Sequence, residues 1–342
     1  MMIMPVTHPI RRRAGFLDLT FYFFILAAVA LISGATAAPA GEPASGPANG
    51  SNAPASIRIG VAQATWQGLN RNDATAAITT WAKTIMQERG AAVAVVTTLF
   101  ESDAELARAL ADGRVDCVSM PADQFLALDR RSQPAEVYLA AHDHSIGERY
   151  VLLVHQDRAP PDLAGLRGGR LLAQSTARTS LALPWLDCVL AAQQLEPPER
   201  LLASIRKTEK PSKAMLPVFF RQAEACLVTS NAFDTASELN PQLRKELRVL
   251  AMSPEVVPAV FFFRCGYKSF AREQLEPSIV ALHQSPAGLQ VLTVFQCDQM
   301  MKCPASCLEA TRQLLARRDR LRGATPSAGK AVTSQEMGHE KP

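Results

Sequence analysis

Short apolar segments of the kind that form buried strands alternate with helical segments along most of this 342-residue chain. The predicted strands are rich in Val, Ile and Leu and comprise residues 57–61, 91–100, 115–119, 137–141, 150–154, 170–173, 203–206, 225–230, 248–252 and 259–263. Apolar residues at helical spacing, preceded by Ser, Asn or Asp caps, predict helices between many of these strands. This order is typical of α/β proteins with mostly parallel sheets flanked by helices.

The alternation is interrupted once, at the polar stretch 142–149, and then restarts. Residues 270–322 show helical periodicity only. An all-helical end after so many strands fits a single barrel poorly and favours two α/β lobes, with C-terminal helices that pack back on the first. The predicted boundaries are 56–142 with 259–322 for lobe 1 and 143–258 for lobe 2, with crossings near 140–148 and 254–262.

The N-terminal 37 residues have the three parts of a secretory signal peptide. Arg11, Arg12 and Arg13 form a basic region, FYFFILAAVALI forms an apolar core, and Ala35-Thr36-Ala37 forms a small-residue exit. The apolar core is shorter than the roughly 20 residues that span a bilayer, so we expect residues 1–37 to be removed on export, with an uncleaved anchor as the alternative. The Pro/Gly/Ala/Ser-rich segment 38–55 is predicted to be a flexible linker, and 323–342 a disordered tail.

Net charge and missing motifs argue against several classes of function. The formal net charge of the whole chain is +4, far from the clustered basic balance of a nucleic-acid-binding protein. The sequence contains no G-x-S-x-G, H-E-x-x-H, P-loop or G-x-G-x-x-G motif, so we expect neither an enzyme nor a bound cofactor.

The seven cysteines divide into two groups. Cys117, Cys188 and Cys226 lie in apolar segments and are expected to be small core residues. The other four lie near the C-terminal region, and in an exported protein at least one disulfide is expected from the cluster Cys297, Cys303 and Cys307, with Cys265 as a candidate partner. The segment His142-Asp143-His144 is interpreted as a polar hinge, and no metal site is expected.

The strongest candidate for a ligand site is the segment DLAGLRGGRLLAQSTARTS, in which a predicted strand leads into the start of a helix. A helix N-terminus offers unpaired N–H groups and partial positive charge to an anion. Hydroxyl groups and one guanidinium gather there, from Ser175, Thr176, Arg178, Thr179 and Ser180. The alternative is that one hydroxyl caps the helix while the others face water.

The first lobe should contribute the facing side of the site, because ligands of open α/β sheets bind beyond the carboxyl ends of the strands. Trp66 follows the first predicted strand, and Met120 follows the third. We expect both to lie at the ligand, with Trp66 walling the side opposite Arg178. Packing between the lobes is the alternative role for Trp66.

These segments together carry a family resemblance. The order IRIGVAQ, ALADGRVDCVSMPADQF, ERYVLLVHQD, the Ser/Thr-rich segment and AEACLVTSNAF resembles periplasmic phosphate/phosphonate-type substrate-binding proteins of ABC transporters, over residues 56–300. The chain departs from the compact Ser-Thr-Ser-Gly form of the phosphonate binders, because Ala177 and Arg178 intervene and no Gly follows.

The resemblance implies the type II periplasmic binding protein fold and a small anionic ligand such as a phosphate or phosphonate. It implies a periplasmic monomer that is recognised by an ABC permease or a membrane sensor, without nucleic acid. The alternative function is a membrane-anchored periplasmic sensory or ligand-binding module that is not coupled to transport.

Overall fold

The computed structural model describes residues 56–66, 70–88, 93–142, 145–158, 160 and 162–323. The predicted signal peptide, linker and C-terminal tail beyond Gly323 lie outside these residues, as do Asp143 and His144 of the predicted hinge. No helix in the described ranges is long and apolar enough to cross a membrane.

The first of two sheets has six strands in the order β11-β4-β10-β3-β1-β2. We call this sheet and the helices on it lobe 1. Its strands are β1 (Ser56–Ala62), β2 (Ala94–Phe100), β3 (Cys117–Pro121), β4 (Glu136–Ala141), β10 (Ala259–Phe263) and β11 (Gln299–Pro304). β1 runs parallel to β2 and β3, whereas the pairs β3–β10, β10–β4 and β4–β11 are antiparallel.

The second sheet, which forms lobe 2 with its helices, has five strands in the order β7-β6-β8-β5-β9. Its strands are β5 (Tyr150–His155), β6 (Arg170–Gln174), β7 (Ser204–Thr208), β8 (Ala225–Thr229) and β9 (Leu247–Met252). β6 is parallel to β7 and β8, while β5 is antiparallel to β8 and β9. Two separate sheets confirm the prediction of a two-lobed α/β fold.

Both sheets are mixed, which corrects the expectation that they are mostly parallel. The chain leaves lobe 1 after β4 and returns into β10, so these strands meet the crossing segments at the same end and run in opposite directions. The same holds in lobe 2 for β5, which starts at the crossing, and β9, which ends near it. Parallel pairs remain where a helix returns the chain between strands.

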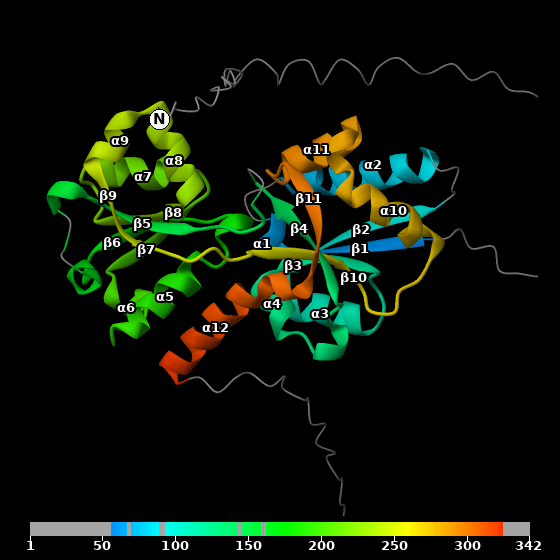
Figure 1. The fold of residues 1–342 in the computed structure, drawn as a ribbon, viewed down its shortest axis with the longest axis horizontal. Helices are drawn as coiled ribbons and strands as arrows, with labels where there is room; N and C mark the ends of the chain where they lie inside the picture. The colour runs from blue at the N-terminus through cyan, green and yellow to red at the C-terminus, as the bar shows by residue number, and fades with distance from the viewer. Residues whose placement is uncertain are drawn as a thin grey trace, which may run out of the picture. The chain divides into compact units, whose positions relative to one another are not determined.

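Helices cover both faces of the lobe 1 sheet (Figure 1). They are α1 (Gln63–Trp66), α2 (Arg71–Glu88), α3 (Asp103–Ala111), α4 (Ala122–Ala127), α10 (Phe270–Val280) and α11 (Pro286–Val294), with 3₁₀ turns η3 (Arg130–Ser132), η7 (Leu282–Gln284) and η8 (Ala305–Leu308). Trp81 of α2 and Leu292 of α11 pack with β1 on one face. Leu106 of α3 and Phe125 of α4 pack with β3 on the other face.

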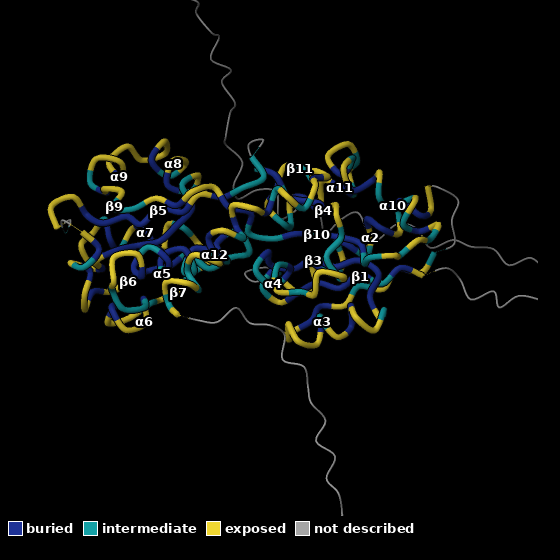
Figure 2. The backbone as a smooth tube through the Cα atoms, turned by 60° about the horizontal axis from the view of Figure 1, so that its bottom comes forward, coloured by how far each residue is buried: buried dark blue, intermediate teal, exposed yellow. Residues whose placement is uncertain are grey.

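Lobe 2 has the same layered construction. Its helices are α5 (Ala182–Ala192), α6 (Pro198–Leu201), α7 (Pro211–Phe219), α8 (Ser230–Leu239) and α9 (Pro241–Glu246), with 3₁₀ turns η4 (Gln156–Arg158), η5 (Leu163–Leu166) and η6 (Ala177–Thr179). Trp185 of α5 anchors the apolar cluster on one face of the sheet, and Met215 of α7 packs on the other. Buried backbone runs through central strands such as β5 and β8, whereas exposed segments lie on the helices and on edge strands such as β7 (Figure 2).

The C-terminal region differs from its prediction in two respects. Residues Gln299–Pro304 form an edge strand, β11, so the region is not helical only. Its sequence QMMKCP has no clear strand pattern, and pairing with β4 supplies the structure. The last helix, α12 (Glu309–Arg322), packs against α5 of lobe 2 as well as α4 of lobe 1, whereas α10 and α11 pack on lobe 1 as expected.

All seven cysteines are free thiols, which contradicts the predicted disulfide. The interpretation of the cluster as a polar turn was the source of the error. Cys303 lies within β11 and is buried, and Cys297 is buried in the cluster beneath α2 and α11. Burial raises the pKa of Cys297 to about 12, which keeps this thiol protonated and unreactive.

Candidate functional site

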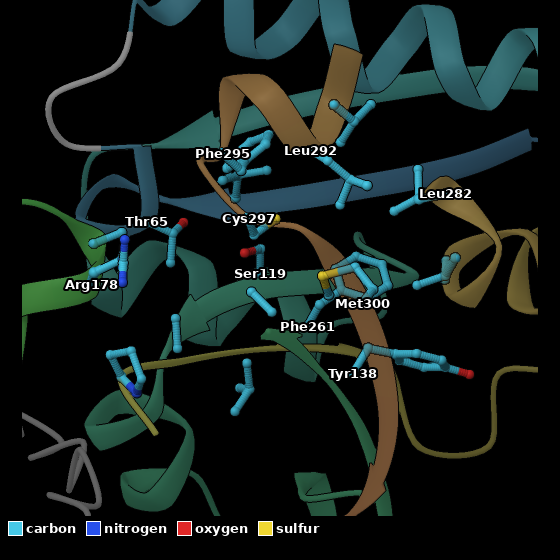
Figure 3. A pocket seen from close by; sticks show the side chains of 18 of the residues that line it. Thr65, Ser119, Tyr138, Arg178, Phe261, Leu282, Leu292, Phe295, Cys297 and Met300 are labelled. Atoms are coloured by element: carbon cyan, nitrogen blue, oxygen red, sulfur yellow. The ribbon is translucent and has the colours of Figure 1, made fainter. Parts of the chain in front are cut away.

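A cavity of about 170 Å³ lies between the lobe 1 sheet and the helices α2, α10 and α11 (Figure 3). Its walls are mainly aliphatic and aromatic and include Ile59, Trp81, Phe261, Leu282, Leu292 and Phe295. Residues of lobe 2 and of both crossing segments complete the lining, so the cavity reaches the junction of the two lobes.

The alternation of side chains along each strand decides which residues face the cavity. On β4, Tyr138 and Ala140 line it, whereas their neighbour Leu139 faces the opposite cluster. On β3, Ser119 lines the cavity and Met120 points to the α3–α4 side, where it is 2% exposed. β3 continues to Pro121, so Met120 lies within the strand and not in a loop beyond it, and the structure does not bring it to the cavity.

Charged side chains meet at one end of the cavity. Arg178 donates a hydrogen bond from Nε to Oε1 of Glu148, whose side chain is only 5% exposed. The Nε2 atom of His142 lies 4.0 Å from the same carboxylate oxygen. Burial raises the pKa of Glu148 above its usual range, although the neighbouring guanidinium favours the ionised form and lowers it.

The Ser/Thr-rich segment forms a tight turn in front of α5. α5 begins only at Ala182, and the preceding residues form the 3₁₀ turn η6, so the predicted helix start at 176–180 lies six to two residues too early. The backbone N–H of Thr176 donates to Oγ1 of Thr179 at 2.9 Å, and that hydroxyl donates to the carbonyl of Gln174 at 2.8 Å. The hydroxyl of Thr179 therefore holds the turn together.

Two further residues of the segment join neighbouring chain segments. Ser180 donates from Oγ to the carbonyl of Pro258 on the returning segment, at 3.1 Å. The backbone N–H of Ser175 donates to the carbonyl of Thr208 at the end of β7. Of the predicted ligand residues on this segment, Arg178 lines the cavity, whereas Ser175, Thr176, Thr179 and Ser180 are not in its lining. Ala177, which was not predicted, also lines it.

Trp66 lies beside the cavity at the end of α1, which contacts η6. Its ring is partly buried against the lobe 1 cluster, and the guanidinium of Arg71 lies 5.8 Å from the ring centroid. The preceding residue, Thr65, lines the cavity itself, and Figure 3 shows it next to Arg178. Trp66 thus packs against the lobe 1 cluster, and Thr65 lines the cavity in its place.

Three polar residues of the site, Thr65, Ser119 and Glu148, are not among the ligand residues predicted from the sequence. A signal was present for Ser119, because period-2 alternation along β3 puts it on the same side as Cys117. Nothing local marks Glu148 as buried. Its backbone pairs with Val256 of the other crossing segment, a contact between distant parts of the chain that no local pattern predicts.

A second group of titratable side chains lies in lobe 2. His155, Asp157 and Glu246 are close enough in the described chain to share a metal ion. However, Arg221 donates from Nε to His155 at 3.3 Å and also pairs with Asp157. The guanidinium of Arg221 already pairs with this cluster, so the cluster is an ion-pair network and does not have the open geometry of a metal centre.

Comparisons with known proteins agree with this architecture. Residues 69–303 match the family of periplasmic substrate-binding proteins of ABC phosphonate transporters. The match covers well over half of the chain, and the chain belongs to this family. No curated protein matches the sequence.

Three solved structures of similar fold are distant from this chain in sequence. The protein XAC2383 of Xanthomonas citri, solved with chloride, is 16% identical with a TM-score of 0.58, and the alignment covers 79% of this chain and 99% of that one. A binding protein component of an ABC phosphonate transporter from Pseudomonas aeruginosa is 14% identical with a TM-score of 0.53, covering 82% and 91%. PhnD1 of Prochlorococcus marinus, in complex with methylphosphonate, is 12% identical with a TM-score of 0.52, covering 79% and 99%.

These similarities confirm the predicted fold, the type II periplasmic binding protein fold, and the predicted family. The protein is therefore a substrate-binding protein of the kind that serves ABC transporters, and this family works in the periplasm.

Proposed function

We propose that this chain is an extracytoplasmic solute-binding protein whose two lobes close on a small ligand with an oxyanion group and present it to an ABC permease. In this proposal the segment 1–37 is removed on export and the mature protein acts as a monomer. Lobe 1 comprises 56–142 and 259–322, and lobe 2 comprises 143–258. Hinge bending at the two crossing segments closes the lobes.

The observation that carries the proposal is the position of Arg178. This guanidinium comes from lobe 2 and lies at the end of a cavity whose other walls belong mainly to lobe 1. The bond to Glu148 uses Nε, and a guanidinium has further N–H donors in a planar fork that suits an oxyanion. The hydroxyl of Ser119 lies on the facing lobe, as does that of Thr65, which donates to the carbonyl of Ala62 at 2.7 Å and can still accept a hydrogen bond. The methylphosphonate in the Prochlorococcus relative supports the same ligand group.

The test is a thermal-shift screen of the purified mature protein with phosphate, phosphite, methylphosphonate, methylsulfonate and acetate, followed by calorimetry. A ligand at 100 times its dissociation constant should stabilise the protein by about 2.7 kcal/mol. Arg178→Gln should weaken binding of any active oxyanion by roughly 10- to 100-fold, because a hydrogen bond to a charged group is lost. Arg167→Gln is the matched control, since Arg167 pairs with Glu196 on the exposed surface of lobe 2.

Binding that is equal in Arg178→Gln and wild type would show that the site lies elsewhere.

The alternative role, an anchored sensory module, is distinguished from a soluble receptor by the mass of the exported chain. A mature N-terminus near Ala38 supports a soluble receptor, whereas a chain that retains Met1 supports the anchored module.

A further inference from the structure

The cavity differs from a site built for a bare oxyanion in how little of its wall is polar. Apart from the polar group at the lobe junction and the hydroxyl of Ser119 on β3, its lining is aliphatic, aromatic or sulfur-containing, and it extends under α10 and α11 into lobe 1. Figure 3 shows Arg178 and Thr65 at one end, and Leu282 and Met300 well away from them. The cavity is therefore polar at one end and apolar along its length.

The charge at the polar end is largely balanced within the protein. Arg178 pairs with the buried carboxylate of Glu148, and His142 lies 4.0 Å from the same carboxylate. A phosphate ion would meet one guanidinium that already has a counter-charge, so electrostatic attraction alone gives it little affinity. Most of the free energy of binding must then come from apolar surface that leaves water.

The volume of the cavity limits the size of the apolar group. An apolar cavity of about 150 Å³ accommodates benzene, so the volume of about 170 Å³ suits a hydrocarbon group of roughly six carbon atoms. The walls that would enclose this group come from three helices and five strands, which makes the cavity well defined in shape.

We propose that the ligand is an amphiphile, in which an oxyacid head group bonds to Arg178 and a hydrocarbon or aromatic body of about six carbons fills the lobe 1 cavity. This inference rests on the proposed function and names its substrate class. An alkylphosphonate, an alkylsulfonate and a medium-chain carboxylate share this chemistry, and the head group is distinguished by experiment.

The test is calorimetric titration of the mature protein with n-alkylphosphonates of one, two, four, six, eight and ten carbons. Sulfonates and carboxylates of the same chain lengths form two parallel series, and n-hexanol is the probe without a charged head. Affinity should rise about fourfold for each added methylene, the equivalent of about 0.8 kcal/mol, and level off near six carbons. Hexanol should bind more weakly than hexylphosphonate.

Two variants link the chain-length dependence to the cavity. Ala140→Leu places a larger side chain in the cavity and should shift the plateau to shorter chains, whereas Ala236→Leu, a matched change on the partly buried face of α8 in lobe 2, should not. If Ala140→Leu does not fold, Met300→Ala enlarges the cavity instead and should move the plateau to longer chains.

Each result has a definite meaning. If methylphosphonate binds as tightly as hexylphosphonate and Arg178→Gln weakens both, the amphiphile is refuted while the proposed oxyanion receptor stands. If hexanol and hexylphosphonate bind equally, the oxyacid head group does not contribute to binding, and its assignment to Arg178 is refuted. If no member of any series binds, both proposals fail. A plateau that is the same in wild type, Ala140→Leu and Met300→Ala overturns the assignment of the cavity.

Discussion

Arg178 of lobe 2 bonds to Glu148 of the outgoing crossing segment, and Glu148 is held by the returning segment. The backbone N–H of Glu148 donates to the carbonyl of Val256 at 2.8 Å, and Val256 donates back at 3.0 Å. The candidate ligand-binding arginine is therefore tied to both segments that join the lobes. A movement of the lobes about these segments would change the position of Arg178 relative to lobe 1.

The first prediction concerns the pH dependence of stability at Glu148. Burial raises the pKa of this carboxyl in the folded protein, so the folded state holds the proton more tightly than the unfolded chain. The contribution of Glu148 to stability is therefore greatest below its unfolded pKa of about 4.3 and falls as the pH rises through the folded pKa. Glu148→Gln should remove this decrease, which urea titrations of both proteins at several pH values would measure.

Glu196 serves as the control, because its pKa shift has the opposite sign. Glu196 is exposed and pairs with Arg167, which lowers its pKa to about 2. Its contribution is present above the unfolded pKa and is lost as the pH falls towards the folded value, although solvent screens it strongly. The free energy of unfolding of the wild type minus that of Glu148→Gln should therefore fall as the pH rises through the folded pKa of Glu148, and a value that rises with pH would contradict the assignment.

The second prediction concerns the hydroxyl of Thr179. This side chain is buried, accepts from the N–H of Thr176 and donates to the carbonyl of Gln174. Thr179→Val keeps the shape but leaves those backbone groups without their partner, which should lower the free energy of unfolding by about 1–3 kcal/mol. Thr98→Val, on the exposed side of β2, is the control and should change it by less than about 0.5 kcal/mol. Equal stability of both variants would show that the hydroxyl is not structural.

The outline of the fold could be predicted from the sequence because it depends on local patterns. The continuous apolar run Tyr150–His155 and the capped, amphipathic helix Asp103–Ala111 can be recognised directly, and the break before β5 marks the crossing. β11 could not be recognised, since pairing with β4 and not local propensity makes it a strand.

The candidate site was only partly accessible to sequence reasoning. Arg178 stood out as a cation beside a strand end, and the structure brings it to the cavity. The hydroxyl of Thr179 looked like a ligand group, but it bonds within its own turn. The apolar cavity leaves no motif in the sequence, because Ile59, Phe261 and Leu292 are far apart along the chain and resemble ordinary core residues.

The third prediction concerns the cysteines. Seven thiols should react with a thiol reagent in the denatured protein without reductant, and a reducing agent should leave the midpoint of thermal unfolding unchanged. In the native protein, the partly exposed Cys265 and Cys307 should react first. Burial raises the pKa of Cys117 and Cys226 well above the usual value, so these two should react only on unfolding. A count of five thiols in the denatured protein would show that one disulfide is present, as the sequence had led us to expect.

The last prediction concerns the ion pair between Arg58 of β1 and Asp116, the residue that directly precedes β3. Asp116 is 1% exposed and accepts hydrogen bonds from Nε of Arg58 at 2.9 Å and from its Nη2 at 2.6 Å. Asp116→Ala should lower the free energy of unfolding by about 3 kcal/mol, because a buried pair loses one partner and the half-buried guanidinium keeps its charge. Asp112→Ala is the control: its pair with Arg114 is exposed on both sides and should contribute less than about 1 kcal/mol. Urea unfolding of the three proteins measures both changes, and equal losses in the two variants would show that burial of Asp116 does not determine the strength of its pair.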